Sequence, residues 1–182
     1  EALTRRWHSL AADWCADNCP DVRERLYHLI GSGRTIEAER IAMRNMYVLM
    51  DNPARELVPG LLSLAESSES PDMAYTVAMI SIRTGMMQEA RRAIERIRET
   101  DNALGDAMES ELELVRGDGE RALKLALRAY RGDMETGLAL GKSMVGSRRY
   151  KEALVFLRRS MEDMRERRCV FRMDEALRAE AE

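Results

Sequence analysis

Apolar side chains recur every three or four residues along most of the chain, which is the spacing of one face of an α-helix. The first segment shows this pattern clearly, and its expected apolar face comprises Leu3, Trp7, Leu10, Ala11, Trp14 and Cys15. Pro20 ends the segment, because the residue before a proline is biased away from the helical conformation. We expect this face to pack into the core.

Capping residues predict the next two helices. Asp21, with Glu24 three residues later, indicates a capping box at the start of a second helix. Gly31-Ser32-Gly33 predicts its end, since glycine accepts the left-handed turn at a helix C-terminus. A third helix is expected over residues 35–50.

Prolines mark the following boundaries. Asn52 as N-cap and Pro53 at the first helical position predict a fourth helix, which Pro59-Gly60 should kink or split. The run Glu66–Ser70 reads as a polar loop, and Pro71 begins the next helix.

A turn followed by a helix start and a small alanine occurs four times. Its last three copies are spaced 32 and 31 residues apart, whereas 52 residues separate the first two. A period of about 30 to 34 residues with two helices per unit is typical of a helical-hairpin solenoid. The small alanine would let the second helix approach the first closely. The copies begin at Gly33, Gly85, Gly117 and Arg148 and end at Ala38, Ala90, Ala122 and Ala153.

The expected fold is therefore all-α: about ten helices forming stacked antiparallel hairpins in a right-handed superhelix. We treat residues 1–182 as a single helical-repeat domain. It has irregular N-terminal helices over 1–52, an irregular helix and loop over 53–70, and more regular repeats over 71–182. Since the chain begins with Glu1 rather than Met, we expect it to be part of a longer protein.

The last unit resembles a tetratricopeptide repeat. Leu140-Gly141 matches the Leu-Gly of the first helix, and Tyr150 with Ala153 matches the Tyr-x-x-Ala that opens the second, followed by Leu157. The other units match only at the turn and the alanine. The resemblance implies that second helices lie on the convex side and that first helices line a concave binding face.

Residues 7–42 resemble the start of the helical-repeat arm of STAND-class ATPases, which are large signal-transducing regulators. The resemblance rests on Trp7–Trp14, on Glu24–Ile30, on the Gly33 turn and on Glu37-Ala38. It implies an ATPase module and a winged helix before Glu1, with this arm sensing a ligand or partner or restraining the ATPase.

Composition narrows the class of protein. The net charge of −3 argues against a nucleic-acid partner for this segment, which would call for a positive excess. No apolar run approaches the roughly 20 residues of a membrane span. Three cysteines do not make a disulfide framework, so a reducing, cytoplasmic location fits best.

Apparent ligand motifs have simpler interpretations. Gly137–Ser143 has three residues between its glycines where a phosphate-binding loop needs four, and no strand precedes it; small residues for packing explain it. Cys15 and Cys19, with His8 and His28, could be drawn as a zinc site, but Cys15 lies in the apolar stripe.

The most basic stretch allows two interpretations. It could bind an acidic partner or nucleic acid, but acidic residues interrupt it, so we favour a solvated terminal helix. Val170-Phe171, which follows, could cap the repeats or dock on a second copy. The basic residues are Arg158, Arg159, Arg165, Arg167, Arg168 and Arg172.

The sequence shows no recognisable combination of a nucleophile, a general base and metal ligands. We therefore expect no catalytic, cofactor-binding or metal-binding residues. The hypothesis is a non-catalytic module for protein interaction or effector sensing, the C-terminal regulatory arm of a STAND-like ATPase. The alternative is a scaffold that assembles with copies of itself, for example as a homodimer, without an attached ATPase. Expected partners are a protein, a peptide or a small effector. The expected contact residues on the first helices are Tyr75, Met79, Arg83, Glu109, Glu113, Thr136 and Lys142.

Overall fold

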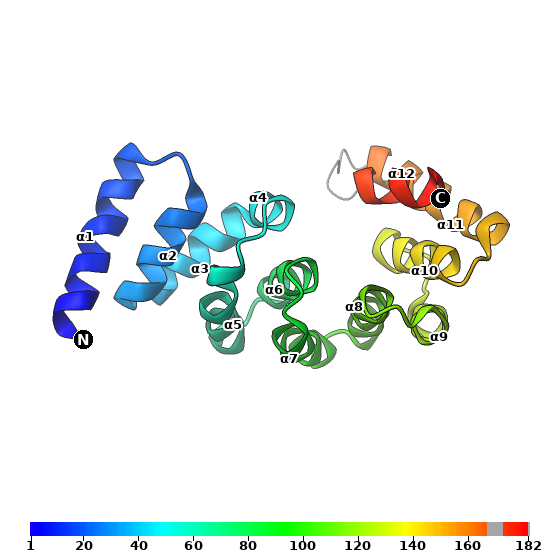
Figure 1. Ribbon diagram of the computed structural model, residues 1–182, viewed down its shortest axis with the longest axis horizontal. Coiled ribbons are helices and arrows are strands. Elements are labelled where there is room, and N and C mark those ends of the chain that lie inside the picture. The colour runs from blue at the N-terminus through cyan, green and yellow to red at the C-terminus, as the bar shows by residue number, and fades with distance from the viewer. Residues whose placement is uncertain (167–172, 182) are drawn as a thin grey trace. The chain divides into compact units, whose positions relative to one another are not determined.

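The computed structural model describes residues 1–166 and 173–181, and over these residues the chain is all-helical, with no β-strand (Figure 1). Twelve α-helices and one 3-10 turn form there, rather than about ten helices. None of the described helices is both long and apolar enough to cross a membrane. The elements are α1 (Ala2–Asn18), α2 (Val22–Ser32), α3 (Thr35–Arg44), α4 (Met46–Asp51), η1 (Arg55–Leu57), α5 (Val58–Ser67), α6 (Pro71–Arg83), α7 (Met87–Arg98), α8 (Asn102–Val115), α9 (Gly119–Ala129), α10 (Met134–Gly146), α11 (Tyr150–Glu166) and α12 (Met173–Ala181).

The chain divides into two compact units, Glu1–Arg96 and Ile97–Glu182, with the division in the last turn of α7. In the first unit α1 packs on α2, α2 contacts α3 and α5, and α6 contacts α3, α4 and α5. Its interior is aliphatic and rich in Met. The largest side chains buried there are Leu26, Leu29, Leu49, Met50, Leu61, Met73, Met79, Ile80 and Ile94.

The second unit is built from two hairpins and a terminal helix. Helix α8 packs on α9, α10 packs on α11, and α12 packs on α10 and α11. Helix α10 also contacts both helices of the preceding hairpin. One apolar cluster joins these helices through Ala126, Leu138, Leu140, Met144, Ala153, Leu157, Met161, Met164 and Ala176.

The four predicted turns have the same backbone structure. At the second turn, for example, Gly85 has a φ of 72°, its N–H donates to the Ile82 carbonyl, and the Met86 N–H donates to the Ser81 carbonyl. The same pair of bonds recurs at Gly33, Gly117 and Arg148, which all have positive φ. This is the Schellman arrangement, which satisfies the free carbonyls at a helix end. The alanine five residues further on is buried in every copy, as predicted: Ala38, Ala90, Ala122 and Ala153.

Small residues let α10 and α11 approach closely. A Cβ on Gly137 would lie 2.7 Å from the Ser160 hydroxyl oxygen, and one on Gly141 would lie 2.7 Å from the Leu157 side chain. The interpretation of Gly137–Ser143 as a packing segment agrees with these contacts. Apolar residues of the second helices are also buried: Ile94, Ile97, Ala126, Ala129, Leu157 and Met161.

The irregular region differs from the prediction at several boundaries; α5, for example, extends to Ser67, into the expected loop Glu66–Ser70. The helix expected over 35–50 is broken at Asn45, where the backbone leaves the helical region and the side-chain amide donates to the Ile41 carbonyl. Asn52 ends α4 instead of capping a new helix, and Pro59 lies in the first turn of α5 instead of kinking a longer helix. A proline in the first turn costs no intrahelical hydrogen bond, so the helix simply begins there.

The first helix forms where predicted, but the expectation that its apolar face is buried is wrong. The positions that α1 buries are Ala12 and Cys15. The large side chains of Leu3, Trp7 and Leu10 are exposed, as is that of Trp14. Helix α1 packs chiefly on α2, through the buried Ala12 and Cys15 and through His8, which bonds His28.

Candidate functional site

The expected contact residues lie on the first helices of hairpins, divided between the two units. Tyr75, Met79 and Arg83 are on α6 in the first unit. Of these, Met79 is buried, while Tyr75 and Arg83 are partly exposed. Arg83 donates to the Met50 carbonyl, which ties the end of α6 to α4.

In the second unit the expected residues are mostly covered. Glu109 and Glu113 on α8 and Thr136 on α10 are buried, and only Lys142 on α10 is partly exposed. Thr136 serves a local role, because its hydroxyl and its N–H both donate to Asp133, the N-cap of α10. The surface that these residues offer to a partner is therefore small.

Helix α8 carries a row of buried carboxylates that are paired with arginines. Asp106 accepts hydrogen bonds from Arg128 on α9 at 2.7 Å and from Arg98 on α7 at 3.1 Å. Burial acts to raise the pKa of Asp106, but the hydrogen bonds from Arg128 and Arg98 outweigh it, so the pKa lies below its ordinary value. Asp106 is thus a fixed anion that holds three helices together.

The remaining carboxylates of α8 continue this network. Glu113 lies 2.8 Å from Arg116 and 3.7 Å from Arg121, and Glu109 lies 3.9 Å from Arg121. Glu111 accepts from Lys142 on α10 at 2.9 Å. Because each carboxylate has a cationic partner, the row is a structural network between helices and not a poised acid–base pair.

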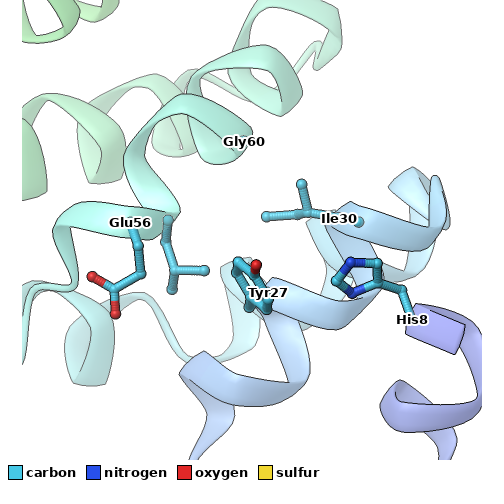
Figure 2. Close-up of a pocket in the computed structure, with 7 residues that line it drawn as sticks. His8, Tyr27, Ile30, Glu56 and Gly60 are labelled. Carbon is cyan, nitrogen blue, oxygen red and sulfur yellow. The ribbon is translucent and has the colours of Figure 1, made fainter. Parts of the chain in front are cut away.

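A pocket in the first unit lies between α2 and the segment formed by η1 and α5. It has a volume of about 130 Å³, and Tyr27 and Ile30 of α2, His8 of α1, Glu56 of η1 and Gly60 of α5 line it. Figure 2 shows the Tyr27 ring between Glu56 on one side and His8 on the other. The pocket therefore combines an aromatic ring, an imidazole and a carboxylate.

A second hollow of about 390 Å³ shares Tyr27 and Glu56 with this pocket. Asp21, Arg23 and Glu24 also line it. Arg23 binds Asp21 through two nitrogens, the closer at 2.6 Å, so these two charges cancel. The carboxylates of Glu24 and Glu56 then make the hollow negative.

The two histidines of the chain form a direct pair. Nδ1 of His8 and Nδ1 of His28 are 2.9 Å apart, which requires one ring to donate and the other to accept. Trp7 and Tyr27 stack edge-on against these rings. Burial lowers the pKa of His28, and the neighbouring His8 lowers it further, while Glu24 opposes the change.

The residues considered for zinc do not assemble. Across the described residues no group of three or more His, Cys, Asp or Glu side chains is close enough to hold a metal ion. Cys15 is buried, and this burial, with Cys19 nearby, raises the pKa of its thiol. Cys15 is a small core residue, as the alternative interpretation proposed.

The basic stretch near the C-terminus is only partly described. Arg158 on α11 pairs with Glu180 on α12 at 2.9 Å. Arg167, Arg168, Val170, Phe171 and Arg172 lie outside the described residues.

Sequence reasoning missed the histidine pair and the pocket. His8 and His28 are 20 positions apart, and nothing in a single sequence shows that the facing sides of α1 and α2 bring them together. A signal for the pocket existed in Gly60, where a Cβ would lie 2.6 Å from the Ile30 side chain. That glycine marks a close approach of α5 to α2.

Comparisons of the chain with protein-family models, with curated proteins and with solved structures find no match.

Proposed function

We propose that this chain is a non-catalytic helical-repeat module, built from tetratricopeptide-like hairpins, that binds a protein or peptide partner. The observation that carries the proposal is the fourfold repetition of one turn, with identical hydrogen bonds and a buried alanine five residues after its left-handed position. The contacts of α10 with both helices of the preceding hairpin support stacking of the kind found in solenoids.

The wider setting is a STAND-class ATPase whose regulatory arm includes this chain. The likeness of residues 7–42 to such arms supports it, and so does Gly33, which adopts the same turn as the later repeats. The nucleotide sequence upstream of the Glu1 codon tests the idea. A phosphate-binding loop encoded in frame supports it, and a start codon immediately before Glu1 rules it out.

Partner binding is tested with peptides selected by display on the intact chain and measured by fluorescence anisotropy. Binding through the first helix α6 predicts that Tyr75→Ala raises Kd by about tenfold, the loss of one good contact. Val155→Ala, at an exposed apolar position on the second helix α11, is the matched control and should leave Kd unchanged. An equal effect of the control, or no selected peptide, contradicts the proposal.

Effector sensing is a second candidate, and the pocket of the first unit favours it. The adjoining hollow, lined by Tyr27 and by the carboxylates Glu24 and Glu56, suits a small organic cation. A series of alkyl diamines should raise the melting temperature of the chain. Glu56→Gln should abolish that rise, whereas Glu152→Gln, on the exposed surface of α11, should preserve it.

A further inference from the structure

Helix α1 presents a large apolar stripe to solvent. Leu3 is 82% exposed, Trp7 59%, Leu10 63% and Trp14 62%. An ordinary surface helix turns its large apolar residues toward the core, but α1 buries Ala12 and Cys15 instead. Exposed apolar stripes of this size mark interaction surfaces.

The spacing of the stripe fits a second helix. Steps of four, three and four residues from Leu3 to Trp14 reproduce the a and d positions of a coiled-coil heptad. We propose that two copies of the chain pair through this stripe, with their α1 helices antiparallel about a twofold axis.

The charges of α1 select a second copy as the occupant. Arg6 and Asp13 are seven residues apart and therefore lie on the same flank of the stripe. An antiparallel twofold pairing places Arg6 of each copy opposite Asp13 of the other, which is the self-complementary contact that such symmetry requires. A parallel pairing would instead place both charges opposite the uncharged flank of the other copy, with no charged partner.

The surroundings of these charges are compatible with the pairing. Asp13 already accepts from Arg34 at 2.6 Å, and a carboxylate has room for a second donor. The opposite flank consists of Thr4, Ala11 and Asn18, which carry no charge, and the small Ala11 permits close approach.

The area is sufficient for a specific dimer of modest strength. From the exposed fractions, the four side chains offer roughly 500 Å² per copy, or about 1,000 Å² for the pair, which is the lower end for specific interfaces. We therefore expect an equilibrium that depends on protein concentration.

Sedimentation equilibrium of the intact chain, combined with its intrinsic fluorescence, tests the dimer. Trp7 and Trp14 are the two tryptophans of the chain and both lie on the stripe, so covering this face changes their emission. The expected result is a mass that rises from one chain to two, with a blue shift of the emission over the same concentrations. A constant single-chain mass overturns the proposal. So does a doubling of mass without a spectral change, or a blue-shifted emission in the dilute monomer.

Variants separate this face from any other. Leu10→Glu should abolish dimerisation with unchanged helical circular dichroism, because Leu10 is exposed in the single chain. The matched control is Ile36→Glu on α3, a position that is 75% exposed, which should leave dimerisation intact. Arg6→Asp and Asp13→Arg should each weaken dimerisation at least tenfold, and the double variant should restore it. Equal association of Leu10→Glu and the original chain, or no rescue by the double variant, contradicts the proposed pairing.

Discussion

The two units of the chain use their apolar residues differently. In residues 97–182 glycines bring α10 against α11, and α10 rests on both helices of the hairpin before it. In residues 1–96 the break at Asn45 and the short turn η1 interrupt the hairpin pattern. That unit leaves a pocket beside Tyr27 and an apolar stripe on α1.

The difference indicates which unit is better suited to the proposed binding. A regular hairpin buries its apolar surface against its neighbours, so it contributes stability and shape. An irregular unit leaves apolar and charged groups open to ligands, which is where binding function is expected.

The largest expected effect comes from overpacking the regular unit. Gly141→Val should lower the free energy of unfolding by about 3 kcal/mol, because a Cβ there meets both the side chain and the backbone of Leu157. Urea titration followed by circular dichroism measures the change. Ser143→Ala on the same helix is the control and should be neutral or stabilising, since its buried hydroxyl has no hydrogen-bond partner. If Gly141→Val leaves the free energy of unfolding unchanged, α10 and α11 are not closely packed.

Removing the anion that links α7, α8 and α9 should have the next largest effect. Asp106→Ala leaves Arg98 and Arg128 without their partner, and we expect a loss of about 1–2 kcal/mol, moderated by the exposure of Arg128. Glu152→Ala, which breaks an exposed pair with Arg149, should leave the unfolding midpoint unchanged. If the two variants behave alike, the network on α8 does not stabilise the unit.

A glycine at Arg148 should stabilise the fourth copy of the repeated turn. Arg148 holds the left-handed position that glycine occupies in the other three copies, so Arg148→Gly should raise the free energy of unfolding by about 0.5–1 kcal/mol. The converse change, Gly117→Ala, should lower it by about 1 kcal/mol. Thermal melts of both variants check this pair, and a destabilising Arg148→Gly would contradict the equivalence of the four turns.

The smallest expected effect is a pH dependence confined to the first unit. Because the pKa of His28 is lowered in the folded chain, the unfolded chain binds a proton near pH 6.5 that the folded chain resists. Stability should therefore fall as the pH drops below about 6.5 and level off once His28 is protonated in both states. Trp7 contacts His28, so tryptophan-detected urea titrations at pH 7.5 and 5.5 report on it. His28→Gln should reduce the difference in unfolding free energy between the two pH values. If the difference is unchanged, a group other than His28 takes up the proton.

Local patterns predicted the regular parts of the fold. The turn glycines, the alanines that follow them and the cap at Asp21 depend on neighbouring residues, so the sequence reveals them directly. Gly141 was likewise correctly assigned to packing.

Features that depend on distant residues were not predictable in this way. Periodicity shows that Trp7 and Leu10 share a helix face, but not which face of the helix meets α2. The same limit hid the pairing of His8 with His28. The break at Asn45 was missed because residues 35–50 keep their helical spacing on both sides of it.

The repeated turn has a consequence for how such a protein can change in length. Each copy joins two helices through the same pair of hydrogen bonds and a residue with positive φ. Recombination at these junctions could therefore duplicate or delete a helix pair without requiring a new type of turn between helices. Such an exchange would leave the backbone hydrogen bonds at every junction unchanged.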